Sequence, residues 1–308
     1  MGKIAFLFAG QGAQYAGMGQ SIYEFVPQAK KALDEMESLF PGLLDICFQD
    51  SQKQLNTTLF TQPCVFAIDY ACAVALQSAN ISPHAVAGFS LGELPAVAFS
   101  GMLSLEQAFM AVLQRAKCMQ AAAQETPGCM CAVLRLDASV AEELASQFLG
   151  VYPVNYNCPQ QTVVAASVDV MPKFESAVAA KGGRCVRLAV SGAFHSPYMV
   201  NAAQAFEYYI TGIPFSLPKM PVYANKTAET YGEAPARLLS AQIANPVLWQ
   251  KTLENMHAAG IDTFIEVGPG KTLTGLVKKT LPHVNVSNVE NFADIEKVLT
   301  FCKEHGNG

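Results

Sequence analysis

The sequence predicts an α/β fold built on a mostly parallel sheet, and three observations support this prediction. The composition is that of a folded chain, because 51% of its 308 residues are hydrophobic and only 15% are charged. Short apolar segments alternate with longer segments of helical periodicity over the first 126 residues. Two of the apolar segments, residues 3–8 and 85–89, each lead into a glycine-containing turn. Strands that alternate with helices in this way form parallel sheets with helices on their faces.

The helices of this first part follow from local patterns. Residues 27–40 are expected to be helical because their apolar side chains recur every three or four positions. Pro63 is expected in the first turn of a helix that opens at Thr61 and runs to about Ser78, since proline suits that position. Further helices are expected at residues 90–98 and, after a polar cap at Ser104, at residues 105–124.

Residues 127–196 are predicted to form an inserted subdomain. Strands are expected at 129–136, 151–156, 161–166 and 184–190, helices at 139–148 and 172–181, and a turn at 157–160. The order βαββαβ is typical of a ferredoxin-like fold. The main body is therefore predicted to comprise residues 1–126 and 197–308, with a late strand at 263–267 and a helix that runs through Lys279.

Composition also limits the class of protein. A net charge of −5 argues against nucleic-acid binding, which usually needs a basic surface. The apolar run at residues 4–9 is too short for a signal peptide, and the stretch at 64–76, which Asp69 interrupts, falls short of the ~20 residues of a membrane helix. The nine cysteines include no C-x-x-C pair, so we expect reduced, mostly buried thiols in a cytoplasmic protein without a metal site.

A candidate nucleophile lies in Gly88-Phe89-Ser90-Leu91-Gly92, which matches G-x-S-x-G between an apolar strand and a helix. Such a turn exposes the serine hydroxyl at the carboxyl end of the sheet. The backbone N–H of Leu91 is then placed to stabilise an oxyanion. The alternative is a glycine-rich turn with a serine that only caps the helix.

His195 is the candidate base for Ser90, because it lies at the predicted junction between subdomain and body, where clefts form. His305 is in the C-terminal tail, and the other three histidines (His84, His257, His283) lie in less suitable segments. A histidine satisfied by its local backbone is the alternative. No acidic residue stands out for a third position, and an amide or a backbone carbonyl can orient the imidazole equally well, since this role needs only an acceptor.

Two further features complete the candidate site. The turn at residues 10–14 lacks the third glycine of a dinucleotide loop, since Tyr15 occupies that position, and a second oxyanion donor is the better interpretation. Arg115 shares a helix face with apolar residues. It is either a surface arginine that packs its stem on the helix or a buried cation that needs an anionic partner.

Seven motifs together resemble the malonyl-CoA:acyl carrier protein transacylases of fatty-acid synthesis, and they follow the family's order over nearly the whole chain. They are G-Q-G-A-Q at 10–14, T-Q-P at 61–63, G-F-S-L-G-E at 88–93, R-x-x-x-M-Q at 115–120, F-H-S at 194–196, Q-x-x-N-P-V-x-W at 242–249 and E-V-G-P-G at 266–270. The resemblance implies an α/β-hydrolase-like body with a ferredoxin-like insert.

The resemblance also implies a ping-pong transfer of malonyl from malonyl-CoA to the pantetheine thiol of acyl carrier protein. Ser90 would be the nucleophile, His195 the base, and the N–H groups of Gln11 and Leu91 the oxyanion donors. A backbone carbonyl near Gln242 would orient His195. Substrate contacts are implied for Arg115, which would hold the malonyl carboxylate, and for Phe194, Gln62 and Asn157. No cofactor or metal is implied, and the partners would be malonyl-CoA and acyl carrier protein, with the enzyme a monomer that binds neither nucleic acid nor membrane.

One residue departs from the family pattern. Phe89 stands where the family usually has histidine, so we expect an altered pocket rather than lost activity. Phe194 resembles malonyl-selective members, because a large side chain leaves little room for an α-methyl group. Three alternatives stay open: an acyltransferase of a polyketide system, a serine thioesterase or esterase, and a silent module that docks carrier protein.

Overall fold

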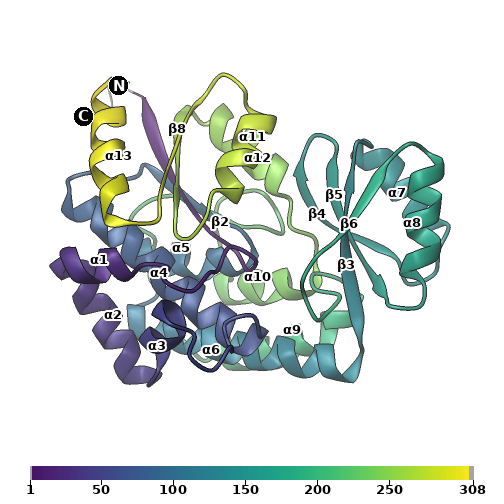
Figure 1. Ribbon diagram of the computed structural model, residues 1–308, viewed down its shortest axis with the longest axis horizontal. Coiled ribbons are helices and arrows are strands. Elements are labelled where there is room, and N and C mark those ends of the chain that lie inside the picture. The colour runs from purple at the N-terminus through teal and green to yellow at the C-terminus, as the bar shows by residue number, and fades with distance from the viewer. Residues whose placement is uncertain (1, 305–308) are drawn as a thin grey trace.

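The computed structural model describes residues 2–304 of the chain, and its strands form two separate sheets. The larger one, sheet A, has five strands in the order β7-β2-β1-β8-β9. The smaller one, sheet B, has four strands in the order β4-β5-β3-β6 and stands beside the body at one end of the molecule (Figure 1). The expected mixed α/β architecture is confirmed in this form.

Sheet A is parallel throughout its paired strands. Its strands are β1 (Lys3–Phe8), β2 (Ala85–Gly88), β7 (Val222–Tyr223), β8 (Ile261–Val267) and β9 (Asn285–Val289). Phe8 pairs with Gly88 on one side and with Val267 on the other. Because the three central strands end level, the loops that follow them meet at one edge of the sheet.

Helices cover both faces of sheet A, and β1 shows why. Ile4, Phe6 and Phe8 pack into one buried cluster, whereas Ala5 and Leu7 pack into another on the opposite face. The first cluster is formed mainly with α1 (Gln20–Phe25), α2 (Pro27–Leu39), α3 (Leu43–Phe48), α4 (Thr58–Ser78), α5 (Glu93–Phe99), α6 (Leu105–Glu125), α9 (Val200–Ile210), α10 (Pro235–Ala241) and α13 (Phe292–Glu304). The second is formed with α11 (Trp249–Ala258) and α12 (Thr272–Thr280).

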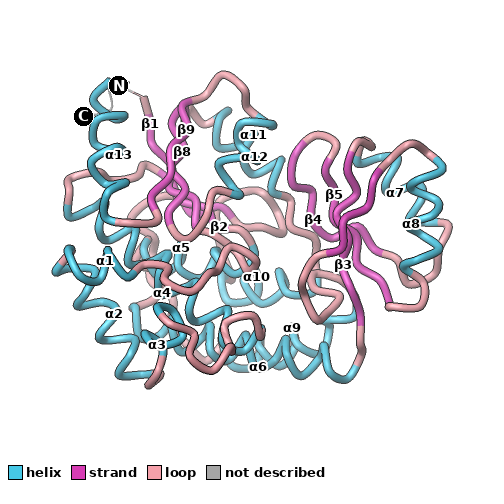
Figure 2. Tube along the Cα trace, in the orientation of Figure 1, coloured by secondary structure: helices cyan, strands magenta, loops and turns pink. Residues whose placement is uncertain are grey.

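Sheet B is antiparallel and has the chain order strand, helix, strand, strand, helix, strand. Its elements are β3 (Gly128–Leu134), α7 (Ala138–Ser146), β4 (Tyr152–Cys158), β5 (Gln161–Ser167), α8 (Met171–Ala180) and β6 (Arg184–Arg187). The helices α7 and α8 lie on its outer face, and the strands lie between them and the body (Figure 2). Met130 and Val163 on the inner face join the core of the body.

The structure corrects several expected boundaries. Helix α4 begins at Thr58, so Pro63 lies inside it rather than in its first turn. The hydroxyl of Thr61 donates to the carbonyl of Leu55, 2.5 Å away, and so joins the first turn of this helix to the segment before it. Asn157 belongs to β4 and not to a turn, and β6 ends at Arg187 instead of continuing to residue 190.

Two expectations about the core can also be compared with the structure. All nine cysteines are free; seven are buried, and Cys129 and Cys185 are partly exposed. Helix α4 is long and apolar enough to cross a membrane by composition, which differs from the expected shorter stretch. However, 78% of its most apolar window is buried inside the protein, as in the core helix of a globular protein.

Candidate active site

Ser90 occupies a strained turn between β2 and the short 3-10 helix η1 (Ser90–Gly92), with φ at 54°. Glycine is required on both sides of it. A Cβ atom on Gly88 would overlap the carbonyl of Gly92, and one on Gly92 would overlap the carbonyl of Phe8. This close packing of turn against sheet holds the serine at the carboxyl end of β2, as the G-x-S-x-G pattern predicts.

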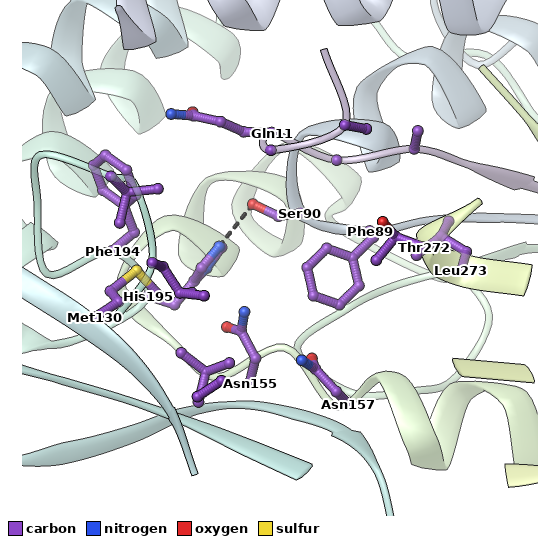
Figure 3. A pocket seen from close by; sticks show the side chains of 18 of the residues that line it. Gln11, Phe89, Ser90, Met130, Asn155, Asn157, Phe194, His195, Thr272 and Leu273 are labelled. Atoms are coloured by element: carbon purple, nitrogen blue, oxygen red, sulfur yellow. Dashed lines mark hydrogen bonds between the residues drawn. The ribbon is translucent and has the colours of Figure 1, made fainter. Parts of the chain in front are cut away.

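His195 faces Ser90 across the cleft, and its Nε2 atom lies 2.7 Å from the hydroxyl oxygen Oγ (Figure 3). Its Nδ1 atom lies 2.8 Å from the backbone oxygen of Gln242. Since a carbonyl oxygen only accepts, Nδ1 carries the proton and Nε2 can accept the serine proton. Burial, assisted by the charge of Arg115, lowers the pKa of His195 to about 4, so the imidazole is neutral at ordinary pH.

Arg115 reaches the same point from helix α6. Its Nη1 donates to the side-chain oxygen of Gln62 at 2.7 Å, and its Nη2 donates to the side-chain oxygen of Gln242 at 2.8 Å. Nη2 also lies 3.2 Å from Oγ of Ser90. The residue is 1% exposed, and burial lowers its pKa to about 10, which leaves it charged. No carboxylate among residues 2–304 forms an ion pair with it, so a charged group beside the nucleophile lacks a direct anionic partner.

Sequence reasoning missed a buried polar network beneath Ser90. The side-chain oxygen of Asn225 accepts from the backbone N–H of Ser90 at 2.6 Å. The side-chain Nε2 of Gln242 donates to the backbone carbonyl of Ser90, also at 2.6 Å. Glu93 accepts hydrogen bonds from Gln242, from the backbone of Asn225 and from Tyr231. The glutamate of the G-F-S-L-G-E motif and the glutamine that opens Q-x-x-N-P-V-x-W are the two signals in the sequence that lie in this network.

The site opens into a cavity of about 260 Å³ between the two sheets, where the cleft was expected. Gln11 lines it, and within the described residues the backbone N–H of Gln11 has no protein acceptor. The N–H of Leu91 belongs to the first turn of η1, where helical partners are lacking. Both parts of the chain contribute to the cavity wall. The body provides Ala9–Ala13, Phe89, Ser90, Arg115, Met119, Glu266, Thr272, Leu273 and Leu276, and the segment 127–196 provides Met130, Ala132, Asn155, Asn157, Gln161, Val163, Leu188, Val190, Phe194 and His195.

The other residues expected to contact substrate do not all line the cavity. Phe194 and Asn157 line the cavity as expected (Figure 3). Gln62 does not line it; Gln62 lies behind Arg115 and holds the guanidinium, so any effect on substrate acts through that cation. Phe89 also lines the cavity and packs edge-on against Trp249, with ring centroids 5.4 Å apart.

The other histidines that the structure describes do not line this cavity. The Nδ1 atom of His84 accepts from the backbone of Ile4, and His257 contacts the carbonyl of Ile261. His283 is on the loop before β9, and His305 lies outside the described residues. His195 is therefore the histidine that the fold brings to Ser90.

Comparison with known proteins agrees with this geometry. A family model described as an acyl transferase domain matches residues 5–307. The chain is 34% identical over 313 residues to malonyl CoA-acyl carrier protein transacylase of Bacillus subtilis, an alignment that covers 99% of this chain and 98% of that protein. The chain belongs to the malonyl CoA-acyl carrier protein transacylase family. The enzyme is thus an acyltransferase.

Two further proteins are similar to this transacylase family member over most of its length. It superposes on malonyl CoA-acyl carrier protein transacylase from Clostridium perfringens with a TM-score of 0.95 and 36% identity, over 99% of this chain and 98% of that one. Polyketide biosynthesis protein ThaF of Burkholderia thailandensis is 37% identical over 285 residues, which are 90% of this chain but only 24% of ThaF.

Proposed function

We propose that the enzyme transfers malonyl from malonyl-CoA to the pantetheine thiol of acyl carrier protein through a malonyl ester on Ser90, and that it supplies fatty-acid synthesis. The observation that supports this most directly is the placement of Ser90 between a neutral base and a buried cation. His195 lies at 2.7 Å and Arg115 at 3.2 Å from the same hydroxyl oxygen. A serine nucleophile needs a base such as His195, and an acyl group with a free carboxylate needs a cation such as Arg115.

In the first half-reaction, Oγ of Ser90 attacks the thioester carbonyl while Nε2 of His195 takes its proton. The carbonyl oxygen becomes an oxyanion between the N–H groups of Gln11 and Leu91. Collapse of this intermediate breaks the carbon–sulfur bond, and the imidazolium returns the proton to the departing thiolate of coenzyme A. In the second half-reaction, the carrier-protein thiol gives its proton to His195 and its sulfur attacks the carbonyl carbon of the malonyl ester. The bond to Oγ of Ser90 breaks, and the imidazolium of His195 returns the proton to Oγ.

Arg115 is proposed to hold the malonyl carboxylate during both steps. Because Nη2 already lies near Ser90, a carboxylate bound to this guanidinium would place the thioester carbon close to the nucleophile. Phe194 would restrict the room around the α-carbon, which favours malonyl over branched acyl groups. Asn157 is proposed to bind the pantetheine arm. Asn157 and Asn155 both line the cavity, and the buried side-chain oxygen of each has no hydrogen-bond partner among residues 2–304.

The finer description of the fold is also part of this proposal. We describe the body, residues 1–126 and 197–308, as α/β-hydrolase-like, and residues 127–196 as a ferredoxin-like insert. The strand order β4-β5-β3-β6 and the parallel sheet with a nucleophile turn after β2 support these descriptions.

The chemistry draws only on side chains, backbone amides and the thioester, so it needs no metal or cofactor. We further propose a cytoplasmic monomer that binds neither nucleic acid nor membrane; free thiols suit that compartment.

A second candidate is transfer within a polyketide system, which the likeness to ThaF favours. The chemistry on Ser90 would be the same, and only the carrier protein would differ. Loading rates measured with a fatty-acid and a polyketide carrier protein would separate the two. A thioesterase would instead release malonate from the serine ester without any carrier protein.

The proposed function is tested by intact-mass measurement after incubation with malonyl-CoA. The wild-type enzyme should gain one malonyl group and lose it when holo acyl carrier protein is added. Ser90→Ala should gain none, because in this mechanism the adduct forms on that hydroxyl alone. Ser100→Ala is a matched control, since its buried hydroxyl donates to the carbonyl of Val97 away from the cavity. Malonylation that persists in Ser90→Ala would overturn the assignment.

A further inference from the structure

Glu93 is a fully buried carboxyl group three residues after the nucleophile, and the mechanism above does not use it. Its Oε2 atom accepts from Nε2 of Gln242 at 3.0 Å and from the backbone N–H of Asn225 at 3.2 Å. The hydroxyl of Tyr231 donates to its Oε1 atom. A carboxyl taken out of water to this extent is costly unless such donors compensate it, so a function should explain its presence.

The two amide residues that Glu93 binds hold the backbone of Ser90 from both sides. The side chain of Asn225 binds the N–H of Ser90 and, through Nδ2, the carbonyl of Gly88 at 2.6 Å. The side chain of Gln242 binds the carbonyl of Ser90. The strained φ of the nucleophile is therefore fixed by two amides that share one carboxylate.

Two acceptors, the carboxylate of Glu93 and the carbonyl of Ser90, decide how the amide of Gln242 is turned. A side-chain amide has a donor end and an acceptor end, and a carboxylate can only accept. Because Nε2 must face Glu93, the oxygen Oε1 faces Arg115 and accepts from Nη2 at 2.8 Å. If the amide turned over, its NH₂ group would point at the guanidinium, which only donates. The charge on Glu93 thus reaches Arg115 through the orientation of one amide.

The charged groups around Glu93 bear on its protonation. Burial raises the pKa of Glu93 to about 7. The nearby cation, Arg115 on α6, opposes this rise. The hydrogen bonds from Tyr231, Gln242 and Asn225 oppose the rise. The charge of Glu93 in turn opposes the lowering of the pKa of Arg115 by burial. His195 contacts this network through the backbone oxygen of Gln242.

We propose that Glu93 is a positioning residue that sets acyl selectivity: its carboxylate orients the side chain of Gln242 and, through it, the guanidinium of Arg115. This inference rests on the proposed role of Arg115 in binding the malonyl carboxylate. Binding of the malonyl carboxylate by Arg115 then depends on Glu93, which does not itself contact substrate. Protonation of Glu93 weakens malonyl loading more than it weakens loading of an uncharged acyl group.

The test compares malonyl and acetyl loading of Ser90 by quenched intact-mass kinetics in the wild type and Glu93→Gln. A neutral glutamine removes the charge from one of the two acceptors that hold Nε2 of Gln242. Gln242 then orients Arg115 less firmly, so the malonyl-to-acetyl ratio of loading rates should fall by roughly tenfold or more, the scale of one buried hydrogen bond to a charge. Asp294→Asn is a matched control, because it neutralises another buried carboxylate on the distant helix α13. Its ratio should equal that of the wild type.

The pH profile gives a second readout that a purely structural role would not change. Wild-type malonyl loading should fall as pH drops through about 7, where Glu93 takes up a proton. Tyr231→Phe removes a hydrogen bond that lowers the pKa of Glu93, so this limb should move to higher pH. In Glu93→Gln the limb should vanish. Should Glu93→Gln fail to fold, the shift in Tyr231→Phe decides the question.

The possible failures are distinguishable. An unchanged malonyl-to-acetyl ratio in Glu93→Gln, with Ser90 still malonylated, overturns the role of Glu93 and leaves the proposed function standing. An acid limb at the same pH in Tyr231→Phe also counts against that role. A wild-type enzyme that forms no malonyl-serine overturns the proposed function itself, and the role of Glu93 with it.

Discussion

The imidazole of His195 is oriented by the backbone oxygen of Gln242, 2.8 Å from Nδ1, and the side chain of that same glutamine holds Arg115. This arrangement explains why the base lacks a carboxylate partner. An acidic side chain at this position would lie next to the guanidinium and neutralise the charge that the substrate carboxylate needs. A neutral carbonyl fixes the tautomer of the base and leaves the cation free for the substrate.

His195 should be essential, and its low pKa should be visible in kinetics. His195→Ala is expected to lower the rate of malonyl loading by roughly 10⁴-fold or more, as loss of the base does in other serine enzymes. Because the pKa of His195 is lowered to about 4, the base should stay neutral throughout the range from pH 5 to 8. The check is the pH dependence of kcat/KM. A limb near the ordinary histidine value that survives in Glu93→Gln would contradict a buried, neutral base.

Arg115→Ala should affect the two acyl classes unequally. Malonyl transfer should lose about 2–4 kcal/mol of transition-state stabilisation, because a charge-assisted contact to the substrate disappears. Acetyl transfer makes no such contact and should be unchanged or faster. Arg115→Lys should be intermediate, since a point charge cannot reproduce the forked guanidinium. The ratio of malonyl to acetyl loading measures this, and an equal loss for both would mean that Arg115 is structural.

Gly88→Ala should abolish activity by distorting the nucleophile turn. The added methyl group would overlap the carbonyl of Gly92, so the turn must open and displace Ser90. The control is Gly275→Ala in helix α12, where a new Cβ meets no atom within 4 Å and alanine favours the helix by about 0.5–1 kcal/mol. Activity and thermal unfolding of both variants can be compared directly. Normal malonyl loading by Gly88→Ala would show that the turn tolerates a side chain.

Asp69 should make the protein less stable as pH rises. It is fully buried in α4, and within the described part of the chain neither of its oxygens has a hydrogen bond of ordinary geometry. The backbone of Ala9 lies close enough to lower its pKa somewhat. Burial, with Glu266 nearby, raises the pKa of Asp69 well above its usual value. The folded state therefore keeps a proton that the unfolded chain releases above about pH 4, and the free energy of unfolding falls with pH.

Asp69→Asn removes this titration. Relative to the wild type, its free energy of unfolding should rise by up to about 1.4 kcal/mol per pH unit as pH rises above 4, until Asp69 itself ionises in the folded protein. Denaturant titrations at several pH values between 5 and 8 measure the difference. Glu296→Gln, on the exposed side of α13, should show no such slope. A constant difference between Asp69→Asn and the wild type would mean that the buried carboxyl is already ionised.

Local sequence was enough to predict the nucleophile turn and the cap of helix α6. The residues that define them lie within five positions of one another, so their backbone preferences are local. The capping box that joins Ser104 to Gln107 is present as expected for the same reason. Elimination among the histidines selected His195, and the resemblance added the backbone carbonyl near Gln242. The structure places His195 beside Ser90 and that carbonyl beside His195.

The surroundings of that serine depend on how distant segments pack together. Glu93 begins a short helix whose sequence does not indicate which side is buried, and its partners Asn225, Tyr231 and Gln242 lie more than 130 residues away along the chain. Asn225 reaches the nucleophile because the two-residue strand β7 pairs with β2, and so short a strand has no readable pattern. Contacts between distant segments depend on how the elements pack, and packing determines which polar groups lose water and must find one another.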